Sequence, residues 1–192
     1  MSAVAVVAQR SRPAAWWGMV TLVAAESTLF GCFVGTYFYL RFTTSVWPPA
    51  GAPRPALVVP VVLALVLVAS AAPMTFALRA ARVGRTAAAR GYVLLALLVQ
   101  AGYFAYSVHE YARQLRLFTP QTDAYGSIYF TMLGADHAHV AVGVLLDVWL
   151  LSKLARGLTR YRVNALWAIA VYWYAVAAIT LVVTGTLLSA RA

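Results

Sequence analysis

Hydrophobic residues in this chain fall into five long blocks separated by short polar segments. A helix needs about 20 mainly apolar residues to cross a hydrocarbon core of roughly 30 Å, and each block is long enough. The pattern therefore predicts an all-α fold, a polytopic transmembrane helix bundle forming a single domain over residues 1–192. The five predicted transmembrane helices cover residues 15–39, 56–78, 88–111, 125–152 and 164–189.

Composition agrees with the block pattern and excludes a soluble globular protein. Hydrophobic residues make up 63% of the chain and charged residues 10%, and the mean hydropathy is +0.79. Soluble domains average about 45–50% apolar and about 25% charged residues. The lone cysteine, Cys32, excludes an internal disulfide, a four-cysteine metal site and the usual two-cysteine haem attachment. The first residues lack the apolar stretch of a cleavable secretory signal, so we expect none.

The net charge of +10 comes from basic residues that cluster between the apolar blocks, as is typical of membrane-flanking loops. We therefore expect no nucleic-acid partner. The positive-inside rule assigns the side richer in Lys and Arg to the cytoplasm, which predicts a cytoplasmic N-terminus and a C-terminus outside. The richer side holds Arg10, Arg12, Arg79, Arg82, Arg85, Arg90, Lys153, Arg156, Arg160 and Arg162, and the other side holds Arg41, Arg54, Arg113, Arg116 and Arg191.

Four of the five acidic residues lie inside the apolar blocks. Glu26 lies near the middle of the first predicted helix, Glu110 near the outer end of the third, and Asp136 and Asp147 in the fourth. A carboxylate in the bilayer costs several kcal/mol and normally faces protein, water or a partner. Because Glu26 and Asp136 lie at similar depths on helices of opposite direction, we expect them to be able to meet at mid-membrane.

The fourth predicted helix carries Asp136, His139, Gly143 and Asp147 at spacings of three, four and four, which predicts one polar stripe. We interpret it as a seam facing the first helix, with Glu26 opposite Asp136 or His139. One hypothesis is a proton-linked or lipid-headgroup site. The other is a hydrogen-bonded packing cluster that determines helix register.

No catalytic, cofactor or metal site is predicted within the chain. His137 and His139 point about 200° apart on a helix, and His109 lies at a different depth, so the three histidines do not match a haem or metal site. Nucleophile, zinc-protease and phosphate-loop motifs are absent from the sequence. These features indicate a subunit of a larger assembly.

Read in chain order, several motifs resemble subunit III of the haem–copper oxidases, the cytochrome c oxidase group. The resemblance covers roughly residues 15–190 and the short five-helix form of the family. It is carried by WWGMVTLVAAESTLF with YFYLR (residues 16–41), WPPAGAPRP with ASAAPM (47–74), HEY (109–111), FTPQTDAYGS (118–127) and GADHAHVAVG (134–143). Glu26 maps onto the intramembrane glutamate of the family.

The resemblance implies a non-catalytic core subunit of a respiratory terminal oxidase that reduces O2 to water and translocates protons. It implies that haem and copper belong to partner subunits I and II. It also implies phospholipid in a cleft between helices and a supporting role in proton uptake and stability. The implied location is the bacterial cytoplasmic (inner) membrane, and a larger respiratory supercomplex is compatible with it.

The sequence also departs from the family pattern in two places. Asp136 stands where members often have the first of two histidines, and His139 matches the second. In the last helix, Tyr174 and Ala177 replace a histidine and an aspartate. Three alternatives stay open at this point: a subunit III-like accessory protein of a nitric oxide reductase, a small proton-coupled transporter using Glu26 and Asp136, and a membrane cytochrome.

Overall fold

The computed structural model describes residues 14–52 and 56–191, and it is helical throughout its regular elements. The helices are α1 (Ala14–Thr43), α2 (Val58–Arg82), α3 (Thr86–Gln114), α4 (Ala124–Leu154) and α5 (Arg160–Leu188), followed by the 3-10 turn η1 (Ser189–Arg191). All five long helices are apolar and long enough to cross a membrane. The predicted all-α fold with five spans is confirmed, and the residues assessed for a signal peptide lie outside the described part.

Four helices begin one to four residues earlier than hydropathy predicts, and a polar residue caps two of them, α4 and α5. The Asp123 side chain accepts a hydrogen bond from the amide of Gly126 at 2.6 Å, so α4 starts at Ala124. Thr159 accepts from the amide of Arg162 at 3.3 Å, so α5 starts four residues before the expected position 164. Such caps satisfy amide groups that the first helical turn leaves unpaired. Polar residues at the membrane surface thus extend the helices beyond their apolar blocks.

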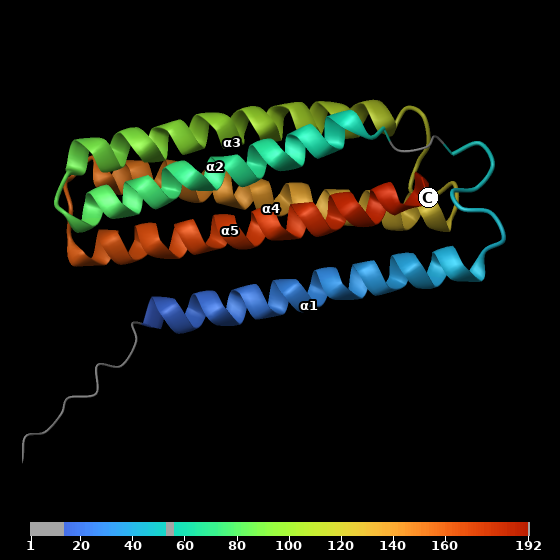
Figure 1. The fold of residues 1–192 in the computed structure, drawn as a ribbon, viewed down its shortest axis with the longest axis horizontal. Helices are drawn as coiled ribbons and strands as arrows, with labels where there is room; N and C mark the ends of the chain where they lie inside the picture. The colour runs from blue at the N-terminus through green and yellow to red at the C-terminus, as the bar shows by residue number, and fades with distance from the viewer. Residues whose placement is uncertain (1–13, 53–55, 192) are drawn as a thin grey trace, which may run out of the picture.

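Helices α2, α3, α4 and α5 form a closed ring, in which each helix packs against two others, and α1 lies outside this ring against α4 and α5 (Figure 1). In the most apolar stretch of α1 only 6% of the residues are buried, compared with 56% in α5. The ring therefore contains most of the core, and α1 is the helix with the most uncovered surface.

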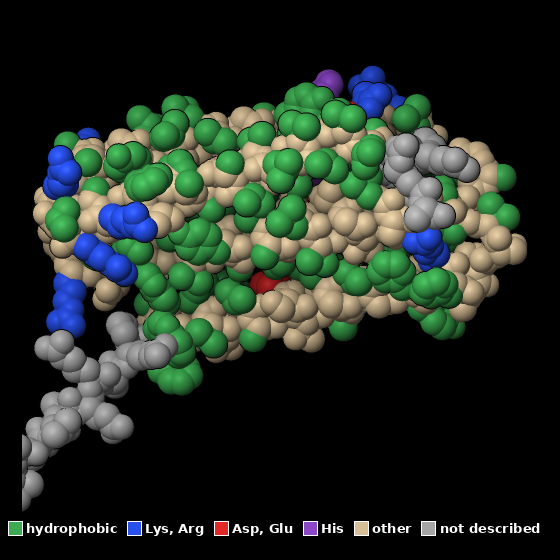
Figure 2. Space-filling view, viewed as in Figure 1, with side chains coloured by type: hydrophobic (Ala, Val, Ile, Leu, Met, Phe, Trp, Pro, Cys, Tyr) green, Lys and Arg blue, Asp and Glu red, His purple; other side chains and the backbone are tan. Residues whose placement is uncertain are grey.

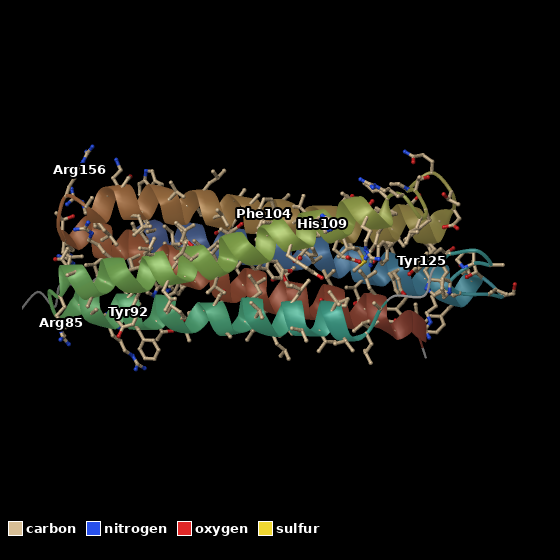
Figure 3. The ribbon with its side chains drawn as sticks, turned by 90° about the horizontal axis from the view of Figure 1, so that it is seen from above. Arg85, Tyr92, Phe104, His109, Tyr125 and Arg156 are labelled. Carbon is tan, nitrogen blue, oxygen red and sulfur yellow. The ribbon has the colours of Figure 1, made fainter. Side chains whose placement is uncertain are left out.

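The two ends of the bundle differ in charge and in the length of their connections. We call one the arginine end, where the short turns 83–85 and 155–159 join α2 to α3 and α4 to α5. Each turn contains a glycine at positive φ, Gly84 at 77° and Gly157 at 91°, a conformation that other residues rarely adopt. The opposite loop end carries segments 44–52, 56–57 and 115–123. Figure 3 shows Arg85 and Arg156 at the arginine end and Tyr125 near the loop end.

The described cations divide as the sequence predicts. Figure 2 shows Lys and Arg side chains gathered at the arginine end. Arg10, Arg12 and Arg54 lie outside the described residues, and the side chain of Arg191 is likewise not described. The described cations at the arginine end are Arg79, Arg82, Arg85, Arg90, Lys153, Arg156, Arg160 and Arg162, and those at the loop end are Arg41, Arg113 and Arg116.

This asymmetry predicts that the arginine end faces the cytoplasm. We expect Leu117→Cys, at the loop end, to react with a membrane-impermeant maleimide in intact cells, in a chain whose Cys32 is replaced by serine. Val83→Cys, at the arginine end, serves as the matched control because its side chain is also exposed (70%, against 60% for Leu117). It should react only after the cells are permeabilised. The reverse pattern would contradict the predicted orientation.

Candidate functional site

Helix α4 presents its polar side chains to three different helices, α1, α3 and α5, so the predicted single seam facing α1 is wrong in part. At about 100° per residue, Asp136, Gly143 and Asp147 lie within about 40° of one another, whereas His139 lies about 60° away from Asp136. This offset turns Asp136 and Asp147 into the ring and directs His139 toward α1. Only His139 therefore contacts Glu26.

Glu26 and His139 form a direct pair between α1 and α4. His139 Nε2 lies 2.7 Å from Glu26 Oε2, and His139 Nδ1 lies 2.7 Å from the carbonyl oxygen of Ala135. Since a carbonyl only accepts, Nδ1 must carry a proton and donate it to Ala135. The contact between Nε2 and Oε2 then holds one proton, either on the carboxyl group or on the imidazole. Both arrangements leave the pair with no net charge.

The Glu26–His139 pair is not fully enclosed by the chain. The exposed fraction is 23% for the Glu26 side chain and 18% for the His139 side chain, although both lie near the middle of their helices. Figure 2 shows acidic surface in the groove between α1 and the other helices. Phe30 packs against the His139 ring at 5.3 Å between centroids, and Tyr172 donates to the backbone carbonyl of His139 at 2.8 Å. Contacts from α1, α4 and α5 thus hold the imidazole of His139 in position.

Asp136 lies inside the ring, away from Glu26. Its side chain is 2% exposed, and Oδ1 accepts a hydrogen bond from Thr180 of α5 at 2.7 Å. Asp136 lines a cavity whose wall also includes Tyr103, His137 and Glu110. The expectation that Glu26 meets Asp136 or His139 is therefore met by the histidine alone.

Asp147 is the centre of a second buried polar contact, nearer the arginine end. Trp173 of α5 donates from Nε1 to both carboxylate oxygens at 3.1 Å. Gln100 of α3, with its amide nitrogen turned to the carboxylate, donates to Oδ2 at 2.6 Å and to the carbonyl of Ala96 at 3.0 Å. The Trp173 ring lies on Gly143, where an added Cβ would come within 2.5 Å of Cζ2. Asp147 thus joins three helices in one hydrogen-bonded network.

Glu110 belongs to neither of these contacts. It accepts two hydrogen bonds from Arg113, at 2.9 and 2.5 Å, and one from Gln114 at 3.2 Å, all within the last turns of α3. It lines one cavity together with Asp136.

Several partners of these acids were not predicted from the sequence: Thr180, Trp173 and Gln100. The sequence does contain a signal for Gln100 as a buried hydrogen-bonding residue, because an amide in the middle of an apolar block needs a buried partner. Thr180 and Trp173 had none, since threonine and tryptophan are common in membrane helices without such a role. In the described ranges, 14–52 and 56–191, no three His, Cys, Asp or Glu side chains lie close enough together to hold a metal ion.

Comparison with known proteins gives a family match over most of the chain. The family described as "Cytochrome c oxidase subunit III" matches residues 9–187. This range includes Glu26, Glu110, Asp136, His139 and Asp147.

Three relatives illustrate the range of similarity. "Probable quinol oxidase subunit 3" of Staphylococcus haemolyticus is 31% identical over 85 residues, 43% of this chain and 42% of that protein. "Cytochrome c oxidase subunit 3" of Bacillus sp. strain PS3 is 26% identical over 163 residues, 82% of this chain and 76% of that protein. "Heme-copper oxidase subunit I+III" of Aeropyrum pernix is 30% identical over 172 residues, 81% of this chain and 20% of that protein. The alignment thus spans less than half of the Staphylococcus relative.

The Glu26–His139 contact predicts different outcomes for two substitutions. In Glu26→Gln, the amide can donate to Nε2 of neutral His139, so we expect little loss of stability. In Glu26→Leu, Nε2 loses its partner in an apolar setting, and the free energy of unfolding should fall by about 1–3 kcal/mol. Thermal unfolding in mild detergent, followed by circular dichroism, measures both. Equal stability of the two variants would argue against a structural hydrogen bond at this position.

The contact between Gly143 and Trp173 predicts a steric effect. Gly143→Ala should force the Trp173 ring away from Asp147 and destabilise the ring of helices by about 1–3 kcal/mol. Gly102→Ala is the matched control, because no atom outside its own helix lies within 4 Å of its added Cβ. The same unfolding measurement should find that control unchanged or slightly stabilised. If Gly143→Ala left the free energy of unfolding unchanged, the indole of Trp173 would have room to move.

Proposed function

The chain belongs to the cytochrome c oxidase subunit III family, and from this premise we propose that it is a non-catalytic subunit of a respiratory haem–copper terminal oxidase. In this proposal the oxidase reduces O2 to water and translocates protons across a bacterial cytoplasmic membrane. Haem and copper are held by partner subunits I and II. The observation that carries the proposal is the family match over residues 9–187.

A fused relative supports a position beside subunit I. The Aeropyrum pernix protein is named "Heme-copper oxidase subunit I+III", and the region similar to this chain is one part of that longer polypeptide. A single chain keeps its two parts close together, so the fusion favours direct packing of subunit III on subunit I. Relatives bear the names of both cytochrome c and quinol oxidases, and the proposal therefore includes either electron donor.

The partly exposed Glu26–His139 pair supports an interface along the groove between α1 and α4. Polar side chains at mid-membrane normally face protein, water or a partner rather than lipid tails. We propose that a neighbouring subunit covers this pair, and that its single shared proton supports proton uptake by the catalytic subunit. A hydrogen-bonded contact that only holds α1 on α4 is the alternative role, and the Glu26 variants distinguish the two when turnover is measured beside stability.

The cleft between α1 and α5 at the arginine end supports phospholipid binding. An apolar space of about 390 Å³ is lined there by Trp16, Trp167 and neighbouring aliphatic side chains of both helices. A second space of about 220 Å³ beside it is lined by Arg82 and Asn164. Acyl chains fit the apolar part, and the Arg82 guanidinium suits a phosphate group. We propose that one phospholipid occupies both.

Purification of the tagged chain from native membranes in mild detergent tests the proposal. We expect a large subunit carrying haem and copper to co-purify, together with phospholipid. Removing this chain alone should leave an oxidase that turns over at first and loses activity faster during turnover than the intact complex.

Other outcomes would contradict the proposal in specific ways. A haem subunit without copper, active on nitric oxide, would assign the chain to a nitric oxide reductase. A colourless chain purified while the oxidase stays intact, and active in proteoliposome uptake, would assign it to transport. A haem spectrum from the isolated chain would indicate a membrane cytochrome.

A further inference from the structure

A cavity lined by both apolar and polar side chains extends from the loop end into the ring formed by α2, α3, α4 and α5. Its mouth is lined by residues in the terminal turns of their helices: Val59 of α2, Gln114 of α3 and Leu188 of α5. Asp136 at its floor lies 12 residues into α4, which corresponds to a depth of about 18 Å. We call this the loop-end cavity. It is separate from the groove that holds Glu26.

One stripe of α3 contributes polar side chains to one wall of the loop-end cavity. Tyr103, Ser107, Glu110 and Gln114 follow one another at spacings of four, three and four residues, and all four line the cavity. This spacing places them on one face of the helix. Figure 3 labels His109, which is adjacent to Glu110 in the sequence, on α3 between Phe104 and the loop end. Polar groups are therefore available at successive depths from Gln114 down to Tyr103.

The polar groups in the wall of the loop-end cavity offer hydrogen-bond partners to water. It leaves about 70 Å³ for the centres of water molecules, enough for on the order of five of them. A buried water needs two to four polar partners, and the cavity wall supplies hydroxyl, carboxyl, amide and imidazole groups. Asp136 accepts one side-chain hydrogen bond among the described residues, from Thr180, so its carboxylate can accept further donors. Thr184 also lines the cavity and contributes a hydroxyl group to its wall.

We propose that water fills the loop-end cavity and that Asp136 binds and releases a proton through it. The proton moves between a carboxyl oxygen of Asp136 and a water oxygen, so the exchange needs no other reactant. The aqueous phase at the loop end supplies and receives the proton. Asp136 thereby forms a proton-binding site distinct from the Glu26–His139 pair, although both sites lie on α4.

Other titratable groups surround Asp136 and define the controls that the test needs. The α2 part of the wall contributes only Val59, Pro60 and Leu63. Arg113 is paired with Glu110 at the cavity mouth. The groups that face Asp136 or lie next to it are Tyr103, Glu110 and Tyr111 of α3, Tyr129, His137 and His139 of α4, Tyr172 of α5, and Glu26 of α1 beyond His139.

Cysteine accessibility in the intact complex tests whether water enters. In the Cys32→Ser background, Ser107→Cys places a thiol in the cavity wall. Val108→Cys places one at the same depth on the outside of the ring, where the Val108 side chain is 42% exposed. The thiolate attacks the sulfur of a thiosulfonate reagent and displaces sulfinate, and the thiolate forms only where water reaches the thiol. In membrane fragments open on both faces, a small cationic reagent should modify Ser107→Cys at least about tenfold faster than Val108→Cys. Equal rates would overturn the proposal of a water-filled cavity.

The pH dependence of the same reaction tests proton binding at Asp136. An ionised carboxylate attracts a cationic reagent and repels an anionic one of the same size, so the ratio of their rates should rise with pH as Asp136 loses its proton. In Asp136→Asn, which keeps an oxygen that can accept from Thr180, the pH-dependent part of the ratio should disappear. Asp147→Asn is the matched control, because Asp147 is equally buried on α4 but lies outside the cavity, and it should leave the ratio unchanged. A pH dependence that survives Asp136→Asn would overturn the assignment to Asp136.

Discussion

Polar side chains within the hydrocarbon region must find their partners inside the protein, and α4 meets this requirement with three different helices. Asp136 binds Thr180 of α5, His139 binds Glu26 of α1, and Asp147 binds Trp173 of α5 together with Gln100 of α3. Leaving any of these groups unpaired in an apolar setting costs free energy comparable to a lost hydrogen bond or more. The arrangement of α1, α3 and α5 around α4 depends on these contacts, because apolar helix faces alone distinguish poorly between neighbours in lipid.

The attachment of α1 shows the consequence most clearly. Near its middle, Glu26 holds α1 on α4. Toward the loop end, Tyr37 accepts a hydrogen bond from Trp47 at 3.1 Å, and Trp47 packs edge-on against Tyr125 of α4. Toward the arginine end, α1 instead borders the cleft lined by Trp16 and Trp167. The helix is thus held at its centre and at one end, which leaves a cleft at the other end and a wide apolar surface for neighbours.

Two polar regions of α4 therefore differ in surroundings although they are one helical turn apart. The Glu26–His139 pair lies at the edge of the ring, partly exposed, in the groove where another subunit can cover it. Asp136 lies inside the ring of helices and lines the loop-end cavity. Protonation at either region changes the local charge within a low-dielectric environment.

The five spans followed from hydropathy, and the division of the connections between two sides followed from the distribution of Lys and Arg. Both predictions depend only on residue type and chain order. The acids within the spans, and the opposition of Glu26 to α4 near mid-membrane, also followed from counting residues along antiparallel helices. The tertiary structure decided which neighbour each polar group meets. Helical periodicity gives the angle of a residue around its own axis, but the identity of the helix at that angle depends on packing. Because His139 and Asp136 lie about 60° apart around the axis of α4, His139 contacts α1 and Asp136 contacts α5. The packing of α2, α3, α4 and α5 into a closed ring forms the cavity beside Asp136.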